Sequence, residues 1–553
     1  MVNQAKLKVG FIIDGDHTAS SYYELIDLLI KNNDIFDSPI IISQIYDLYA
    51  PGLRSSNKNF ISKFSRRLLY SLIVRIERLF LKRNLCLQDY GQTCSTMALN
   101  LKKVMVHPII SLSGSVHSFS GKDLKRIEDE QCHILIRCGR GILKGKILSI
   151  AKFGIISFHH GNNKEIRGMP AGFWEVYLDW PSTGFIIQQL TEKLDDGNVL
   201  FRGSITTASY WQLNAARINY KSKVFLFDLL KDIAKDHKLP EFERRLLHPG
   251  KIFTTPSLKV LFNYFCSNIF NFINNKFWYF LGYRHRWSVS YVKANGINSS
   301  LEQGTTIQNP KNGFLADPFV ISMNNADYCF VEDYSYEKEI GKISCYKISE
   351  SGYESLGTAI EENFHLSFPY IFKFEENLYM CPETAQINEI RIYKCLAFPN
   401  QWALDRTLMK DVSAADSVIF PFQSKWFLLT NICSSHMGDR SSELHLFSAS
   451  NPLSNKWLKC DSNPIVFDAQ KARNGGFFLI DGKPYRVNQK HNKSKYGVGF
   501  SINAIETIGE HFYSETEVLS IDPTFFKNLS GAHHLHMNEN FCVYDHSSFQ
   551  KVK

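Results

Sequence analysis

The second half of the chain repeats one short apolar unit, and this repeat limits the available folds more than any other feature. Many short strands separated by turn signals are typical of an all-β sandwich, barrel or propeller. Five copies, roughly every forty-five to sixty residues, favour a five-bladed β-propeller, which we predict for residues 301–553. The copies are Asp317–Ile321, Phe368–Phe372, Asp416–Phe420, Gly475–Leu479 and Ala532–His536.

Further strands are expected between these copies, and each copy is followed by a second strand. The expected strands outside the copies are Tyr328–Glu332, Ile343–Ile348, Leu378–Pro382, Arg391–Cys395, Trp426–Thr430, Glu443–Ser448, Lys483–Asn488, Gly497–Ile505 and Asn540–Asp545.

The first half of the chain alternates strands and helices instead. Lys8–Asp14 is a predicted strand, Ser21–Lys31 an amphipathic helix and Pro39–Ile45 a second strand. A strand–helix–strand start is what a doubly wound parallel sheet requires. A long helix over Ser209–His237 closes this half. We therefore predict an α/β domain of Rossmann type over residues 1–245 and a helical, aromatic-rich connector over 246–300.

Composition places the chain among soluble multidomain proteins. A length of 553 residues is too great for one core. The formal charge of +9 suits an anionic partner and does not require nucleic acid. Twelve cysteines without a Cys-x-x-Cys pair indicate reduced thiols and a cytoplasmic location. A cytoplasmic protein that associates peripherally with the inner membrane is also compatible with this expectation. No run of about eighteen apolar residues occurs, so no membrane span is expected.

Two segments combine apolar side chains with basic or aromatic ones. Ser62–Asn84 holds seven Lys or Arg and one Glu, with leucines at helical spacing. Leu258–Trp287 is dense in Phe, Tyr and Trp. Each segment could lie on an anionic membrane surface, but apolar stripes on helices are more often core. We favour packing for both and keep peripheral membrane contact as the alternative.

Four landmarks occur in order in the first half. They are Cys138–Leu143, Ser157-Phe158-His159, Arg167-Gly168 and Leu194–Leu200. This series resembles the folate-dependent formyltransferases, the family of methionyl-tRNA formyltransferase and the sugar N-formyltransferases. The chain departs from that family in two places, because Ser157 stands where the family has Asn and Lys144 where it has Pro.

The resemblance implies a site for formyl transfer from 10-formyltetrahydrofolate. His159 would stabilise the oxyanion or move a proton, and Asp195 would orient His159. Ser157 can donate one hydrogen bond but is shorter than Asn. A structural alternative is that the paired histidines only cap a strand turn. The residues implied to bind substrate or cofactor are Arg167, Gly168, Ile142, Leu143, His160 and Asn162.

The second half resembles the arabinanase/levansucrase-like propellers. More closely, it is similar to the propeller found on plant glucosamine inositolphosphorylceramide transferases. The residues that carry this resemblance are Ala316-Asp317-Pro318, Pro382-Glu383-Thr384, Asp416-Ser417 and Asp481–Arg486.

This resemblance implies that carboxylates meet in a central funnel. Asp317 stands where related glycosidases have a catalytic carboxylate, and Glu383, Asp416 and Arg473 are further funnel candidates. The structural alternative is that such an Asp only starts a turn. No metal site is predicted. The cluster of His533, His534 and His536 is interpreted as buried histidines, with a metal ligand set as the alternative.

These patterns lead to one main hypothesis for function. The chain is expected to be an N-formyltransferase that modifies a nucleotide-linked amino sugar for a bacterial surface polysaccharide such as lipopolysaccharide. The propeller would then bind glycan or hold a homodimer together, without any nucleic-acid partner. The alternative is a carbohydrate-active propeller, glycosidase or glycosyl-transferring, beside a non-catalytic formyltransferase-like domain. A third hypothesis is a glycan-binding protein without catalytic activity.

Overall fold

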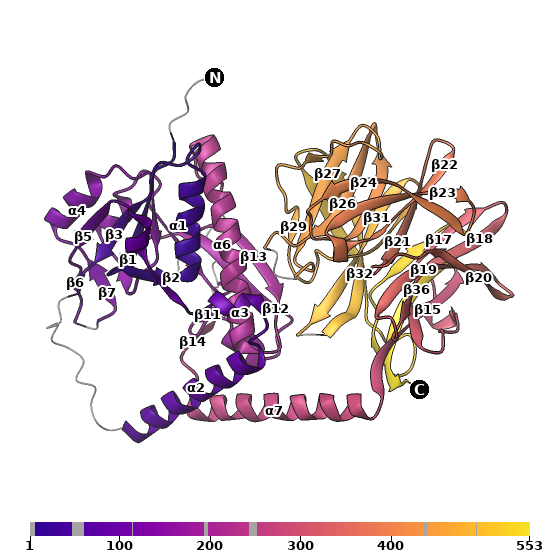
Figure 1. The fold of residues 1–553 in the computed structure, drawn as a ribbon, viewed down its shortest axis with the longest axis horizontal. Helices are drawn as coiled ribbons and strands as arrows, with labels where there is room; N and C mark the ends of the chain where they lie inside the picture. The colour runs from indigo at the N-terminus through magenta and orange to yellow at the C-terminus, as the bar shows by residue number, and fades with distance from the viewer. Residues whose placement is uncertain are drawn as a thin grey trace. The chain divides into compact units, whose positions relative to one another are not determined.

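The chain divides into two units in the computed structural model, which describes residues 6–46, 60–112, 114–192, 197–242, 251–435, 439–493 and 495–552. The division falls inside helix α7 (Leu258–Phe280). Figure 1 shows helices around a sheet in the indigo-to-magenta half, and strands almost alone in the orange-to-yellow half. Unit 1 comprises Met1–Leu178, Thr183–Ser204 and Ala208–Asn268, and unit 2 comprises Asp179–Ser182, Ile205–Thr207 and Ile269–Lys553.

A mostly parallel sheet forms the centre of unit 1. Its strands pair in the order β5–β3–β1–β8–β10–β12–β13, and the first five are parallel to one another. β12 is antiparallel to β10. These strands are β1 (Val9–Asp14), β3 (Ile40–Gln44), β5 (Lys103–Val106), β8 (Ile134–Arg137), β10 (Ile155–His159), β12 (Ser182–Gln189) and β13 (Asn198–Thr206). The α/β fold predicted for the first half is therefore confirmed.

Apolar runs explain this sheet. β1, β3 and β8 are buried along nearly their whole length, as parallel strands covered on both faces usually are. The core on one side includes Ile12, Ile42, Leu135 and the helical Ile127. The other elements of unit 1 are β2 (His17–Ala19), α1 (Ser20–Lys31), α2 (Phe60–Phe80), α3 (Leu85–Asp89), β4 (Thr93–Ser95), β6 (Ile109–Ile110), β7 (Val116–Ser118), α4 (Gly121–Glu128), β9 (Ile142–Leu143), β11 (Ile166–Gly168), α5 (Phe173–Tyr177), α6 (Trp211–Asp236) and β14 (Lys251–Phe253).

Helix α2, the basic segment singled out in the sequence, is only partly buried. Ile73 is in the core with Leu261 and Tyr264 of α7, and the Tyr264 hydroxyl donates to the buried Glu77. Other apolar side chains of α2, such as Leu68, stay exposed. One face of the segment thus packs as we favoured, while membrane contact by the other stays a prediction. Among the described helices, none is long and apolar enough to cross a bilayer.

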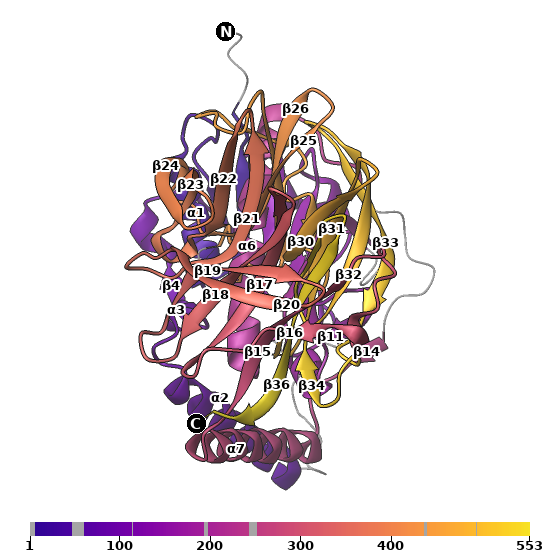
Figure 2. The ribbon, with the colours of Figure 1, turned by 90° about the vertical axis from the view of Figure 1, so that its right-hand side faces the viewer.

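Antiparallel sheets make up unit 2. Its described strands form five of them, and each sheet consists of neighbours in sequence except one, in which β15 pairs with β36 at the other end of the unit. The first strands contact one another in turn: β17 contacts β21, β21 contacts β25, β25 contacts β30, β30 contacts β35, and β35 contacts β17. Figure 2 looks onto this unit and shows the sheets following one another in that order.

The bounds of these strands are β17 (Gly313–Met323), β18 (Ala326–Ser335), β19 (Ile340–Ser349), β20 (Gly352–Ile360); β21 (Ser367–Phe374), β22 (Asn377–Glu383), β23 (Glu389–Ala397), β24 (Gln401–Lys410); β25 (Ala414–Phe422), β26 (Lys425–Ile432), β27 (Glu443–Ala449), β28 (Leu458–Lys459), β29 (Val466–Phe467); β30 (Asn474–Ile480), β31 (Lys483–Asn492), β32 (Lys495–Ile508), β33 (Tyr513–Ile521); and β15 (Tyr283–Lys293), β16 (Thr305–Thr306), β34 (Leu529–Gly531), β35 (Leu535–Met537), β36 (Phe541–Lys551).

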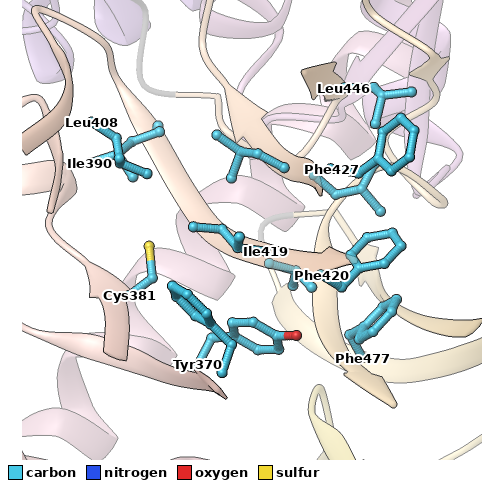
Figure 3. Close-up of a cluster of buried hydrophobic side chains, with 14 of the residues drawn as sticks. Tyr370, Cys381, Ile390, Leu408, Ile419, Phe420, Phe427, Leu446 and Phe477 are labelled. Carbon is cyan, nitrogen blue, oxygen red and sulfur yellow. The ribbon is translucent and has the colours of Figure 1, made fainter. Parts of the chain in front are cut away.

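Aromatic side chains join neighbouring sheets. Phe319 of β17 meets Phe368 of β21 edge to face, with ring centroids 4.9 Å apart. Phe420 of β25 stacks on Phe477 of β30 at 4.3 Å. Figure 3 shows the buried cluster around Phe420 and Phe477, to which Tyr370 of β21 also belongs. Aromatic residues of the first four sequence copies therefore form part of the core between sheets.

Each of four first strands carries the same irregularity. The pairing with the second strand skips two residues, which are Asp317-Pro318, Phe368-Pro369, Asp416-Ser417 and Gly475-Gly476. Asp317 and Asp416 have left-handed backbones, both with φ 49°. A β-bulge turns a side chain away from its ordinary direction, and Asp tolerates this conformation better than most residues. The bulges thus fix where Asp317 and Asp416 lie.

The fifth copy begins one residue later than the sequence pattern suggested. His533 and His534 lie outside the strand ladder, between the bridged Ala532 and the first residue of β35. His533 therefore takes the place that Asp317 has in the first copy. The pattern starting at Ala532 was wrong by one position, because it matched apolar character instead of the bulge.

The predicted connector 246–300 is not helical throughout. Helix α7 ends at Phe280, and Gly282 follows with φ 83°, a backbone conformation that suits glycine after a helix. The residues from Tyr283 onward form β15, which pairs with β36 along its whole length. The last part of the predicted connector is therefore a strand of unit 2.

Candidate functional site

Buried acidic side chains gather in unit 2, and they come from several sheets. Every one of them is less than a sixth exposed, which is rare for carboxylates without partners. They are Asp317 on β17, Glu332 on β18, Glu383 on β22, Asp416 on β25 and Asp545 on β36. We call these five residues the carboxylate cluster.

His533 lies between two members of the cluster. Its Nε2 is 3.2 Å from Oδ1 of Asp317, and its Nδ1 is 2.8 Å from a carboxylate oxygen of Asp545. Burial lowers the pKa of His533, but the charge of Asp545 and the bond to Asp317 raise it overall, to about 10. His533 is therefore a cation at neutral pH, held by two carboxylates.

The same contacts keep Asp317 ionised. Burial alone raises the pKa of Asp317, but the hydrogen bond and charge of His533 lower it to about 2. The other carboxylate oxygen, Oδ2, accepts the backbone N–H of Phe368 at 3.2 Å. Asp317 is thus an anion over the whole physiological pH range.

Raising the pH from about 7 to about 9 is expected to destabilise unit 2. Folding raises the pKa of His533 from an ordinary value of about 6.5 to about 10, so its stabilisation is complete below the lower value. This stabilisation decreases as pH rises between the two pKa values and is lost above the higher one. Between pH 7 and pH 9 the decrease is about 2 kcal/mol. Calorimetry at both pH values measures the loss.

A matched pair of variants isolates His533 in that experiment. His533→Gln should flatten the alkaline slope of stability, whereas His511→Gln should keep it. His511 also faces an Asp, Asp461, but both side chains are about seven-tenths exposed. Equal slopes in the wild type and in His533→Gln would contradict the assigned charge.

Arg473 joins two other members of the cluster. Its Nε donates to Asp416, and its Nη2 lies 3.2 Å from Oε2 of Glu383. Gln489 also donates to Asp416, at 3.1 Å. Burial lowers the pKa of Arg473, but Asp416 and then Glu383 raise it overall, so the guanidinium stays charged. The predicted funnel residues Glu383, Asp416 and Arg473 therefore lie together.

Like Asp416, Glu332 is a member of the cluster with a raised pKa. Burial raises its pKa well above the ordinary value, and the charge of Asp317 raises it further. On the ladder between β17 and β18, Glu332 lies opposite Ala316, the residue before Asp317. Its Oε1 is 3.6 Å from Nε2 of His365. Two carboxyl groups with opposite pKa shifts, lowered in Asp317 and raised in Glu332, thus lie in one buried site.

Asp317, His533 and Asp545 also offer one ligand atom each within 4.8 Å of one another, a spacing that can hold a metal ion. A histidine ligand must be neutral, however, whereas both nitrogens of His533 face carboxylates. His536 accepts the backbone N–H of Val320, and His534 is fully buried beside Phe319. These contacts fit a protonated His533 between the carboxylates of Asp317 and Asp545 better than a metal ligand.

The predicted formyl-transfer residues lie in unit 1. Ser157 and His159 are on β10, opposite Gln188 and Ile186 of β12. The Ser157 hydroxyl donates to the carbonyl of Phe158 at 3.2 Å. The predicted partner of His159, Asp195, lies outside the described residues.

The remaining predicted residues of this site are spread over three elements. After β10, His160 bonds Ser222 of α6 at 3.0 Å, and burial lowers its pKa to about 4. Asn162 accepts from Arg202 at 2.6 Å. Arg167 and Gly168 are on β11, which pairs with β14, and Ile142 and Leu143 form β9, which pairs with β7.

Sequence patterns missed a polar cluster at the carboxyl ends of β1, β3 and β8. Asp14 accepts from the side chains of Gln44 at 3.1 Å and Tyr46 at 2.7 Å, and from the backbone of Arg140 at 2.9 Å. Carboxyl ends of parallel strands are the usual place for ligands in such sheets. The turn Asp14-Gly15-Asp16 was the available signal.

Comparisons with known proteins separate the two halves. Residues 293–538 match the family model of "Glucosamine inositolphosphorylceramide transferase 1, N-terminal". Glucosamine inositolphosphorylceramide transferase 1 of Arabidopsis thaliana is 33% identical over 210 residues, which are 37% of this chain and 27% of that protein. The chain thus spans about a quarter of the length of this relative.

Two further similarities cover the halves separately. Methionyl-tRNA formyltransferase of Ehrlichia ruminantium (strain Welgevonden) is 23% identical over 250 residues, or 42% of this chain and 82% of that protein. The crystal structure of a thermostable family-43 glycoside hydrolase is also similar. The match covers 37% of this chain and 75% of the hydrolase chain, with a TM-score of 0.30 and 15% identity.

These findings correct the main functional hypothesis. The prediction of a folate-dependent N-formyltransferase is wrong, because the family model and the relatives above 30% identity are glucosamine inositolphosphorylceramide transferases. The placement in bacterial surface polysaccharide formation is wrong for the same reason, since those relatives are plant proteins. Binding of 10-formyltetrahydrofolate to unit 1 stays a prediction. The N-terminal half is similar to a methionyl-tRNA formyltransferase, and the C-terminal half to the N-terminal part of glucosamine inositolphosphorylceramide transferase 1.

Proposed function

We propose that unit 2 is a five-bladed β-propeller that transfers a glycosyl group, with unit 1 as a non-catalytic scaffold. The name of the relatives suggests the substrate class: a sugar attached to, or to be attached to, an inositolphosphorylceramide-type lipid head group. The successive contacts of the first strands and the pairing of β15 with β36 support the propeller.

One observation carries the proposed chemistry, namely the opposite pKa shifts of two neighbouring carboxyl groups. Most glycosidases break a glycosidic bond with one carboxylate that attacks or activates and one acid that protonates the departing oxygen. Environments that separate the pKa values of two carboxyl groups assign these roles. Asp317, with its lowered pKa, is the carboxylate, and Glu332, with its raised pKa, is the acid.

A second candidate function is glycan binding without turnover. The observation that favours it is that most of the cluster already has charged partners: His533 for Asp317 and Asp545, and Arg473 for Glu383 and Asp416. Satisfied ion pairs of this kind also hold a propeller together.

A pH–rate profile distinguishes these functions. The purified chain is expected to transfer or release sugar from glycosylated inositolphosphorylceramide and from aryl glycosides, detected by mass spectrometry. The rate should fall as pH rises through the raised pKa of Glu332, because the acid then loses its proton. Glu332→Gln should lose about a hundredfold in rate and also lose this alkaline limb.

Glu354→Gln is the matched control, because Glu354 is exposed on β20 of the same sheet. It should retain both the rate and the profile. Glycan binding without turnover on any of these substrates would support the second candidate and refute the transfer reaction.

A further inference from the structure

A pocket of about 510 Å³ lies in unit 2, and all its lining residues belong to that unit. Three elements supply most of its wall: the last turns of α7, strand β15 and the start of β32. Its lining includes Trp278, Tyr279, Arg284, Trp287, Lys495 and Tyr496.

The pocket is positively charged. Arg284 and Lys495 line it, and no Asp or Glu is among its lining residues. The guanidinium of Arg284 lies over the rings of Tyr279 and Tyr336, at 4.8 Å and 5.4 Å, so its charge faces aromatic carbon and not a carboxylate. Two cations in an aromatic pocket favour an anionic group such as a phosphate.

The inner wall of the pocket touches His533, which lies against the carboxylate cluster. The rings of Trp287 and Tyr496 lie 4.1 Å and 5.0 Å from the ring of His533, which is bonded to Asp317. A ligand held in the pocket would therefore lie beside this cluster, separated from it by these rings.

Helix α7 presents apolar side chains beside the pocket. Phe270, Ile273, Phe277 and Phe280 follow one another at helical spacing and are each more than half exposed, Phe280 at 86%. The whole helix contains no acidic residue and carries two Lys. The next residues after Phe277, Trp278 and Tyr279, already line the pocket. Aromatic residues next to cations are typical of helices at a lipid interface.

We propose that this pocket binds the phosphate of an anionic membrane phospholipid, while the exposed side chains of α7 lie among the outer acyl carbons. Arg284 and Lys495 would pair with the phosphate, and the apolar residues of α7 would replace water with lipid. The site does not depend on glycosyl transfer, because it uses neither Asp317 nor Glu332.

Vesicle co-sedimentation of the full chain tests the site. The chain should bind phosphatidylcholine vesicles that contain phosphatidic acid at least about tenfold more tightly than pure phosphatidylcholine vesicles. The double variant Arg284→Gln, Lys495→Gln should weaken this binding roughly twenty-five-fold, at about fivefold for each charge. The double variant Phe277→Ser, Phe280→Ser should weaken it about tenfold or more.

Matched substitutions elsewhere in unit 2 serve as controls. Lys483→Gln removes a cation that pairs with Glu506, and Phe512→Ser removes a Phe that is 56% exposed. Both should bind like the wild type, and far-ultraviolet circular dichroism confirms that each variant is folded.

Two results would overturn the proposal. If the pocket double variant bound anionic vesicles as the wild type does, the attraction would come from other basic residues such as those of α2. If inorganic phosphate alone bound to the pocket as tightly in calorimetry as the vesicles do, the ligand would be a soluble phosphate and not a lipid. If the wild-type chain transferred no glycosyl group but bound anionic vesicles as expected, the proposed function would be refuted and this lipid site would stand.

Discussion

Asp317→Asn is expected to reduce glycosyl transfer by about a thousandfold or more, with the fold retained. The substitution removes the negative charge of the carboxylate that, in the proposed reaction, attacks the sugar or activates the attacking group. It keeps a side-chain oxygen that can still accept the N–H of Phe368, so the bulge of β17 has no steric reason to change. The measurement is the transfer rate at saturating substrate, beside a binding isotherm for the same substrate.

Asp327→Asn is the matched control for this experiment. Asp327 is also buried and also on the first sheet, but it accepts from Ser322 and Asn538 at the hairpin between β17 and β18. Its substitution should leave the rate within about twofold of the wild type, because it does not touch the cluster. A folded Asp317→Asn that keeps more than half of the rate would remove Asp317 from the reaction.

A second readout separates a reacting carboxylate from a structural one. The loss of charge at Asp317 should lower the pKa of His533, since the bond to Asp317 is one of the causes that raise it. Nuclear magnetic resonance titration of the imidazole follows this change. A purely structural Asp317 would show the pKa change with an unchanged transfer rate.

The repeat predicted the inner strands of unit 2 well, because each carries an apolar run that must be buried. The fourth strands β20, β24 and β33 were not predicted. Few of their side chains are buried, so no continuous apolar run marks them. Strand β15 was hidden as well, because its aromatic residues continue the composition of α7.

The candidate site was predictable only where it coincides with the repeat. Asp317 and Asp416 stand at the bulged position of their copies, and Glu383 and Arg473 lie in or next to residues that the pattern had singled out. Glu332 and Asp545 stand on second strands, where nothing local distinguishes a buried acid from an exposed one. The contact of His533 with Asp317 joins residues about two hundred positions apart, which a single sequence does not reveal.

Arg473→Met is expected to destabilise unit 2 by about 3 to 5 kcal/mol, the largest stability effect predicted here. The guanidinium is almost fully buried and bonds both Asp416 and Glu383. Methionine has a similar length but no charge, so both carboxylates would stay buried without a cation. The measurement is the free energy of unfolding from urea denaturation at neutral pH.

Arg406→Met is the surface counterpart, because Arg406 pairs with Asp405 where both side chains are partly exposed. Its loss should cost less than about 1 kcal/mol. If repulsion between unpaired carboxylates causes the larger effect, adding Glu383→Gln and Asp416→Asn to Arg473→Met should restore part of the stability. Lowering the pH should narrow the deficit as well, because protonation neutralises the same two groups. A deficit that neither change reduces would mean that Arg473 stabilises the sheets through packing alone, and the charge network would then not hold the cluster together.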